Sequence, residues 1–248
     1  MKNILIAIAL IIASYSAGAQ YTQQGKIEYE RKVNIKRMLD DLDDEQKQWI
    51  ERFKAQIPQF NITYFDLYFD NAKSIYKPGR EVDGGGMKMW FAQSPANDNI
   101  VYTDLQAEKV KASKTVYEQK FLVQDTVRKI EWKLYDEMRT IANYRCRKAV
   151  GKMFDSVYVV AYYTDDIPAS GGPEMFAGLP GMILQIAVPR LHTTWIAQKV
   201  DIDKPKDTDF AVSDKGKKVN NKEMSDMLKD SFKDWGKYAE KNLWWTLL

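Results

Sequence analysis

The sequence predicts an α+β protein: a strongly curved antiparallel β-sheet, close to a half-barrel, with one internal and one C-terminal helix packed on it. Segments rich in aromatic and β-branched residues recur between residues 25 and 202, and several alternate apolar with polar positions, as strands do. No regular alternation of strand and helix appears along the chain, which favours antiparallel neighbours over a parallel sheet. Two stretches have the periodicity of amphipathic helices.

The first 19 residues are expected to be a secretory signal peptide. Lys2 precedes an apolar run from Ile4 to Ala13, which is well short of the about 20 residues needed to cross a bilayer. The small residues Ala17-Gly18-Ala19 fit a signal peptidase site, so we expect the mature chain to begin at Gln20. The only cysteine is Cys146, so a lipid anchor at that site is excluded. We expect an exported protein, periplasmic or otherwise in the cell envelope, with no transmembrane segment in the mature chain.

The first strand is predicted in residues 25–35 by a period-two pattern. Charged residues lie between apolar positions that share one side of an extended chain: Ile27, Tyr29, Val33 and Ile35. An internal helix is predicted over residues 38–57, because an apolar stripe recurs at helical spacing until Pro58 ends it. Residues 61–77 then predict a hairpin that turns at Asp70-Asn71.

Six further strand segments are close enough together for antiparallel neighbours. They are residues 99–105, 114–123, 140–150, 155–164, 182–188 and 193–202. A second helix is predicted from Asn220, where Glu223 completes a capping box. Residues 20–205 are therefore expected to form one antiparallel β domain. Residues 206–248 are expected to form a polar connector and an amphipathic helix packed on that domain.

The most distinctive segment is the Gly-Pro loop, residues 171–181, between two predicted strands. Pro180 and Gly181 occupy the second and third positions of a predicted type II turn, in which Gly181 needs a positive φ. Two interpretations stay open. The loop is either a rigid connector that plugs one end of the core, or a preorganised platform for a ligand or partner. The residues assigned to this motif are Gly172, Pro173, Phe176, Gly178, Leu179, Pro180, Gly181 and Met182.

The same residues carry a resemblance. The run Gly178-Leu179-Pro180-Gly181-Met182-Ile183 follows Gly172-Pro173 and the stretch YYTDDIP at residues 162–168, and NYRCRKA stands at residues 143–149. This order of motifs resembles the GLPGLI family of exported Bacteroidetes proteins, with Met182 where the second leucine of the motif usually falls. The family is of unknown function, so the resemblance implies export to a Bacteroidetes-type envelope and no particular activity.

Residues suited to catalysis or metal binding are few. Cys146 and His192, the only residues of their types, are available as a nucleophilic pair, but the strand pattern predicts that Cys146 is buried. Weak metal candidates are carboxylates for calcium (Asp165, Asp166 and Glu174) and thioethers for Cu(I) (Met87, Met89, Met153, Met175 and Met182). No phosphate-loop or dinucleotide motif is present, so we expect no cofactor.

Composition narrows the function classes further. Hydrophobic residues make up 45% of the chain, enough for a core, and a formal net charge of +3 with interspersed signs argues against nucleic-acid binding. We therefore expect a non-enzymatic envelope protein that binds an apolar ligand, a peptide or a partner protein through the concave face or the Gly-Pro loop. The alternative is a metal-handling protein that uses methionine or carboxylate ligands, and an enzyme is the least favoured class.

Overall fold

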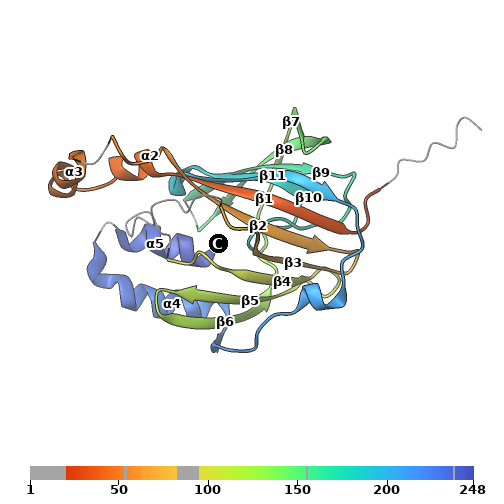
Figure 1. Ribbon diagram of the computed structural model, residues 1–248. Helices are drawn as coiled ribbons and strands as arrows, with labels where there is room; N and C mark the ends of the chain where they lie inside the picture. The colour runs from red at the N-terminus through yellow and green to blue at the C-terminus, as the bar shows by residue number, and fades with distance from the viewer. Residues whose placement is uncertain (1–20, 53–54, 83–94, 155, 237) are drawn as a thin grey trace, which may run out of the picture.

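The computed structural model describes residues 21–52, 55–82, 95–154, 156–236 and 238–248 (Figure 1). In these residues twelve strands form one sheet, in the order β12-β6-β5-β4-β3-β2-β1-β11-β10-β9-β8-β7. The strands are β1 (Gly25–Asn34), β2 (Phe60–Phe69), β3 (Lys73–Pro78), β4 (Ile100–Asp104), β5 (Lys109–Val116), β6 (Gln119–Thr126), β7 (Lys133–Ile141), β8 (Tyr144–Met153), β9 (Val157–Thr164), β10 (Met182–Val188), β11 (Thr193–Asp201) and β12 (Lys217–Val219).

The pairing is antiparallel throughout this sheet, apart from β12, which lies parallel to β6. Strands β1 to β6 are neighbours in chain order, and so are β7 to β11. Two meanders therefore meet where β1 pairs with β11. The sheet curls around a concave side (Figure 1), which confirms the predicted curved antiparallel sheet with helices packed on it.

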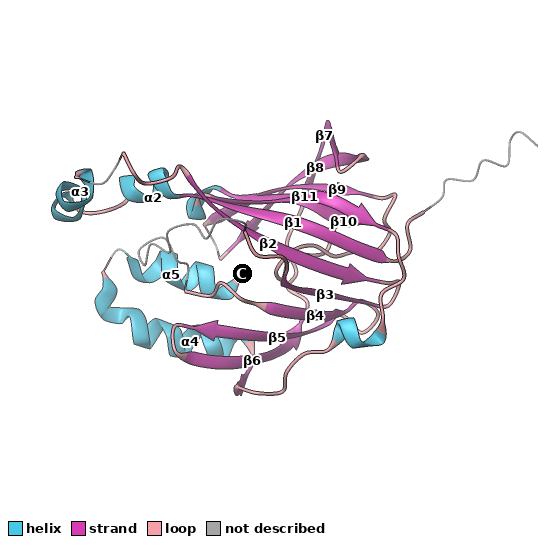
Figure 2. Ribbon diagram, in the orientation of Figure 1, coloured by secondary structure: helices cyan, strands magenta, loops and turns pink. Residues whose placement is uncertain are grey.

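Helices cover the open side of the sheet. The α-helices are α2 (Ile35–Asp40), α3 (Asp44–Glu51), α4 (Asn221–Phe232) and α5 (Tyr238–Leu247), and the 3-10 turns are η2 (Pro189–Leu191), η3 (Asp207–Phe210) and η4 (Lys233–Trp235). In Figure 2, α5 lies between the upper strands of the sheet and β5, with the C-terminus pointing into the same space, and α4 lies beside β5 and β6.

Both predicted helices are shorter than expected. The internal helix is divided into α2 and α3, because the first helix ends at its C-cap residue Asp41. It also begins earlier than predicted, since Asn34 caps it by accepting a hydrogen bond from Arg37 N at 3.1 Å. Phe53, an apolar residue within the predicted helix, lies outside the described residues. The capping box of Asn220 and Glu223 is present at the start of α4. The C-terminal helix is broken near Gly236, whose φ is +55°.

Two strand predictions missed hairpin turns. Residues 114–123 were predicted as one strand, but β5 and β6 turn at Tyr117, which has a φ of +52°. Residues 140–150 likewise contain the turn between β7 and β8, where Ala142 and Asn143 both have positive φ, as a type I′ turn requires. Neither turn carries glycine, so the strongest sequence signal for a hairpin was absent.

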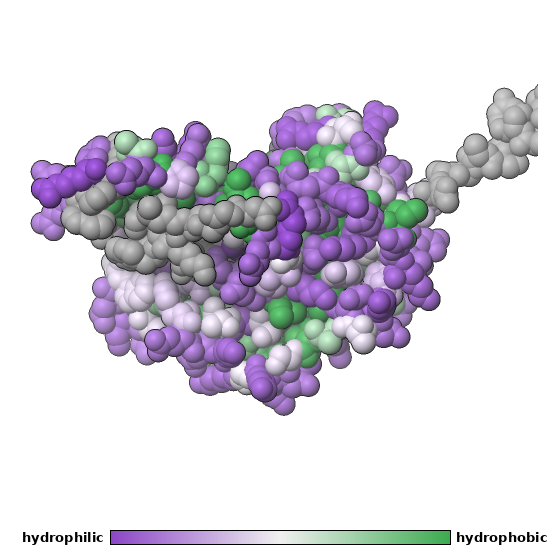
Figure 3. Space-filling model, in the orientation of Figure 1, coloured by the Kyte–Doolittle hydropathy of each residue, from purple (hydrophilic) through white to green (hydrophobic). Residues whose placement is uncertain are grey.

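The core lies on the concave side, and the outer surface is polar. Figure 3 shows one face of the molecule as mostly hydrophilic, with small separate hydrophobic areas. Besides this main hydrophobic core, a second, smaller hydrophobic cluster joins α2 and α3 through buried Ile35, Leu39, Ile50 and Ile57. Among the described helices, none is both long enough and apolar enough to cross a membrane.

Candidate binding site on the concave side of the sheet

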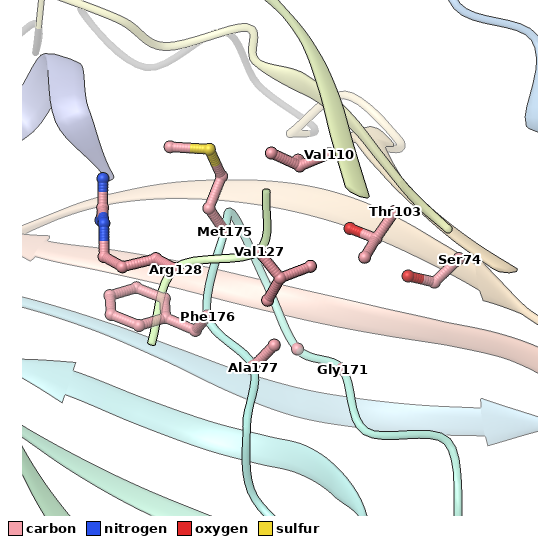
Figure 4. Close-up of a pocket in the computed structure, with 10 residues that line it drawn as sticks. Ser74, Thr103, Val110, Val127, Arg128, Gly171, Met175, Phe176 and Ala177 are labelled. Atoms are coloured by element: carbon pink, nitrogen blue, oxygen red, sulfur yellow. The ribbon is translucent and has the colours of Figure 1, made fainter. Parts of the chain in front are cut away.

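The Gly-Pro loop folds inward and fills part of the concave side. Phe176 and Leu179 are each 2% exposed, and Met182 is fully buried at the start of β10. The Phe176 ring packs edge-on against Trp195 of β11, with ring centroids 6.3 Å apart. In Figure 4 the loop passes in front of the sheet, and Met175, Phe176 and the Arg128 side chain lie on the same side of it.

Hydrogen bonds satisfy the buried backbone of this loop. Met182 N donates to Ile167 O at 3.0 Å, and Ile183 N donates to Gly171 O at 2.8 Å. The indole nitrogen of Trp132 donates to Ala177 O at 3.0 Å. A buried loop without such partners would be strongly destabilised, so these bonds fix its position much as a strand ladder would.

Gly181 has the backbone conformation that its position in the sequence predicts. Its φ is +143°, and a Cβ there would lie 2.0 Å from Thr164 O. The turn itself differs from the predicted type II turn. A type II turn would have a hydrogen bond from Met182 N to Leu179 O. Instead, Gly181 N donates to Leu179 O at 2.8 Å, and Met182 N donates to Ile167 O outside the turn.

A group of buried polar side chains lies beside the loop. Its members are Arg31, Tyr76, Asn99, Lys114 and Glu174, which we call the interior polar cluster. Asn99 Nδ2 donates to Glu174 Oε2 at 2.8 Å, and the Trp195 indole donates to Tyr76 OH at 3.0 Å. Burial raises the pKa of Glu174 even though Lys114 and Arg31 oppose the shift. Burial lowers the pKa of Lys114 to about 7, although Glu174 attracts the charged form.

The last residues of the chain reach this cluster. Lys114 Nζ donates to Thr246 O at 3.0 Å and to Leu248 O at 2.5 Å. Half-buried Arg128 donates to Leu247 O at 2.6 Å. We call the interior polar cluster together with Arg128 the concave site. Two of its three cations, Lys114 and Arg128, therefore hold three consecutive main-chain oxygens at the end of α5.

Aromatic side chains of α5 complete the contact. Trp244 and Trp245 are both buried. The centroids of the Trp245 and Trp195 rings lie 6.3 Å apart, and Cζ of the Arg190 guanidinium lies 5.8 Å from the centroid of the Trp244 ring. The end of α5 is thus bound through apolar rings and through its main chain together.

A surface contact fastens the start of α5. Asp41 Oδ2 contacts His192 Nε2 at 3.0 Å and Lys241 Nζ at 2.6 Å. Tyr238 OH donates to Asp43 Oδ2 at 3.2 Å. We call these contacts the surface latch. Gly236, just before α5, has open space around it, since a Cβ there would meet no atom within 4 Å.

The concave site retains unused hydrogen-bonding capacity. Arg31 is 1% exposed; its Nη2 donates to Asn97 Oδ1 at 2.8 Å and its Nε to Thr63 Oγ1 at 3.0 Å. Arg31 Nη1 and Asn99 Oδ1 find no partner among the described residues. The cavity between the loop and Arg128 has a volume of about 10 Å3, room for about one water molecule (Figure 4). Between the loop and Arg128 there is therefore no room for a larger molecule.

The metal candidates do not come together. Asp165 and Asp166 are exposed, whereas Glu174 is buried in the concave site. Met153, Met175 and Met182 belong to the core, and Met87 and Met89 lie outside the described residues. In the described parts of the chain, no three His, Cys, Asp or Glu side chains are grouped as metal ligands would be.

Cys146 and His192 are engaged separately. Cys146 is fully buried in β8, where burial raises the pKa of its thiol to about 12, so the thiolate needed for nucleophilic attack is scarce at neutral pH. His192 lies at the surface latch instead, with Asp41 as its partner.

Apart from Glu174, the polar residues of the concave site were missed in the sequence, although a signal existed for two of them. Arg31 stands between Tyr29 and Val33, at an inward position of the first strand. Lys114 likewise stands between Ala112 and Val116, and all three are buried. A charged residue on the apolar face of an alternating strand marks a buried charge, and buried charges are rare unless they are paired.

The chain was compared with protein families and curated proteins. The model of a family described as a protein of unknown function (Porph_ging) matches residues 151–185, which contain β9 and the Gly-Pro loop. The match is consistent with an uncharacterized family in this segment, and the GLPGLI name stays a resemblance. No curated protein matches the chain.

Two solved structures share the fold. The structure of PNGF-II in space group P21 is similar with a TM-score of 0.53 and 15% identity, over 83% of this chain and 33% of that chain. The structure of PNGF-II in space group C2 also gives a TM-score of 0.53, with 16% identity over 83% of this chain and 32% of that one. The chain therefore spans about a third of the length of PNGF-II. At such low identity the likeness concerns the fold alone.

Proposed function

We propose that the protein is an exported, non-enzymatic envelope protein that binds a segment of a partner polypeptide at the concave site, which α5 covers in the free protein. One observation carries the proposal: Lys114 and Arg128 donate to the main-chain oxygens of residues 246–248. Main-chain oxygens are common to all polypeptides, so a site that holds those of α5 has the chemistry to hold those of a partner.

The burial of Lys114 supports a role beyond capping a helix. Lysine side chains commonly cap the last carbonyls of a helix from the surface, where the ammonium stays hydrated. Lys114 is instead fully buried, and removing a charge from water is expensive unless it is well paired. Such a lysine is suited to binding, since its main-chain acceptors are provided only when a polypeptide segment is present.

The attachment of α5 supports its displacement. Apart from its buried end, α5 is held by the surface latch, by a hydrogen bond from Tyr117 OH to Asn242 Oδ1 at 3.2 Å and by packing against α4. The latch and the Tyr117 bond join exposed polar groups, and such contacts contribute little to stability. Gly236 provides a point before α5 about which the backbone can rotate without steric hindrance. The Gly-Pro loop, whose backbone is bonded inside the sheet, stays in place as one wall of the site.

The decisive experiment supplies α5 as a separate peptide. In the full chain, Trp245→Ala weakens the internal α5 at its largest buried contact, and a synthetic peptide of residues 238–248 with the natural sequence is added. We expect the peptide to raise the thermal midpoint of this variant with the logarithm of its concentration, and the corresponding gain in the free energy of unfolding is about 2.7 kcal/mol at a hundred times its Kd. A peptide in which both tryptophans are replaced by alanine is the control and should have no effect.

A second variant protects the experiment against poor folding of Trp245→Ala. Lys241→Ala breaks only an exposed pair of the surface latch, so the core is untouched. Fluorescently labelled peptide should bind this variant more tightly than it binds the unmodified protein. If neither variant binds the natural peptide at millimolar concentration, the proposed function is wrong.

Export is a separate part of the proposal, and it is supported by the sequence of residues 1–19. Intact-mass analysis of protein isolated from its native envelope should find a chain that begins at Gln20. A mature chain that retains Met1 would contradict export with cleavage.

A further inference from the structure

We infer that the concave site recognises its partner by a free α-carboxylate, so that the ligand is the C-terminus of a polypeptide with apolar residues before it. The inference rests on the proposed function, because it names the ligand class of the same site. It follows from the balance of charge in the site, from the convergence of its donors and from an unpaired donor.

The charge of the site is unbalanced. Apart from the end of α5 itself, the described side chains that face the site supply three cations, Arg31, Lys114 and Arg128, against the single side-chain carboxylate of Glu174. Glu30 and Asp66 are also buried, but the strand register places them on the other face of the sheet, and Asp66 pairs there with Lys26 at 2.8 Å. Buried cations need anionic partners, so a ligand with a carboxylate would improve the balance.

One other carboxylate lies near Arg128. Asp125 is only partly buried, and it accepts from Thr126 N at 2.7 Å and from Asn221 N at 2.9 Å. Its oxygens therefore serve the start of α4. The cations of the concave site remain in excess after Asp125 is taken into account.

The donors converge on one point. Lys114 Nζ reaches the oxygens of Thr246 and Leu248, and Arg128 holds the oxygen of Leu247 between them. A carboxylate presents two oxygens with full charge, and charge-assisted hydrogen bonds are about twice as strong as those to a neutral carbonyl. The same two donors would therefore bind a terminal carboxylate more tightly than an internal peptide group.

Arg31 adds a reserve donor to the site. Its Nη1 is buried without a partner among the described residues, while Glu174 is near enough to the Arg31 charge to be influenced by it. Arginine offers a planar fork that suits carboxylates. This unpaired nitrogen is what a site for an additional anion would contain.

The test compares two peptides that differ in one group. Residues 238–248 are synthesised with a free C-terminal carboxylate and with a C-terminal amide, and both are titrated against the full-length Trp245→Ala variant. We expect the free acid to bind at least tenfold more tightly. Equal affinity for both peptides would overturn the carboxylate inference and leave the proposed function intact, whereas binding of neither peptide would remove the proposed function itself.

A second measurement identifies the group responsible. Adding Lys114→Met to the Trp245→Ala variant should abolish the preference for the free acid, while Lys241→Ala, which changes a cation outside the site, should preserve it. If the preference survives in the Lys114→Met variant, the carboxylate is bound elsewhere and the inference is wrong.

The pH dependence of affinity provides a test in the Trp245→Ala variant alone. A carboxylate favours the charged form of Lys114, so binding of the free acid must take up a proton once the free site has lost it. Affinity for the free acid should therefore fall as the pH rises through the pKa of Lys114 in the opened site, by up to tenfold per pH unit, and affinity for the amide should fall less. An identical pH dependence for both peptides would contradict the inference.

Discussion

The Gly-Pro loop and α5 fill the same concave side of the sheet, but they are held there in different ways. The loop is bonded through its own backbone to neighbouring segments, and at Gly181 only glycine fits the space. The end of α5 is held by side chains of Lys114 and Arg128 and by aromatic packing, with a latch at the surface. A segment whose own backbone is hydrogen-bonded to its neighbours is a fixed part of the fold. A segment held only by side chains of other elements can be displaced by another polypeptide. The comparison assigns the loop to the frame of the site and α5 to its occupant.

The largest effect is expected from Gly181→Val. A branched side chain would meet Thr164 O at 2.0 Å from its Cβ and would also need a disfavoured φ, so the free energy of unfolding should fall by at least about 3 kcal/mol. Denaturant unfolding measures the change. Gly236→Ala is the control, because its φ is also positive but its surroundings are open; with φ +55° and ψ −131° it should cost about 1–3 kcal/mol from backbone strain alone, less than the clash and strain together at Gly181. Equal effects at the two glycines would end the argument from close packing.

Leucines of equal burial distinguish the two regions next. Leu179 of the loop is 2% exposed and Leu248 after α5 is 1% exposed. Leu179→Ala should lower the global stability by about 2–5 kcal/mol, as for other buried leucines. Leu248→Ala should instead act mainly on local opening of α5, seen as faster hydrogen exchange there with a smaller shift of the global midpoint. If both variants lower the global midpoint equally, α5 is as much a part of the frame as the loop is.

The pH dependence of stability tests the role of Lys114, which contacts the end of α5. The pKa of Lys114 is about 7 in the folded protein and near 10.5 in the unfolded chain. Between these values the unfolded chain binds a proton that the folded protein lacks, so stability should rise with pH, by about 2 kcal/mol from pH 7 to pH 9. The Lys114→Met variant should lack this rise in denaturant unfolding measured across that range. An unchanged slope would mean that Lys114 is not the titrating group.

The smallest effect on stability is expected at the surface latch. Lys241→Ala removes an exposed pair with Asp41, so the free energy of unfolding should change by less than about 1 kcal/mol. Hydrogen exchange in α5 should nevertheless become faster than in the wild type, while exchange in the central strands β1 and β11 stays the same. Faster exchange in the strands as well would indicate that α5 and the sheet open as one unit.

Much of the fold could be predicted from the sequence, because alternating apolar residues and the absence of a strand-helix rhythm are local signals. Gly181 was also predictable, since its positive φ follows from the residues next to it. The hairpin turn at Tyr117 was not, because it lacks the residue types that mark such turns.

The site itself was largely beyond sequence reasoning. Glu174 was recognised as a candidate, but as a surface ligand for calcium and not as the carboxylate of a buried cluster. Lys114 and Leu248 are 134 residues apart in the sequence, and no local sequence pattern predicts a hydrogen bond between residues so far apart. The inward position of Lys114 was visible, but only the three-dimensional structure pairs it with the end of α5.

The joining of two meanders at β1 and β11 has a consequence for how the chain folds. Within each meander the pairings are between strands adjacent in the chain, so each closes a shorter loop than the pairing of β1 with β11 does and is expected to form sooner. Pairing Val33 with Thr193 closes a far longer loop, so we expect it to be the slow step. Arg31, Asn99 and Lys114 come from the first meander, whereas Glu174 and Trp195 come from the second. Neither half contains the concave site, and the chain acquires it only when the seam between the halves has closed.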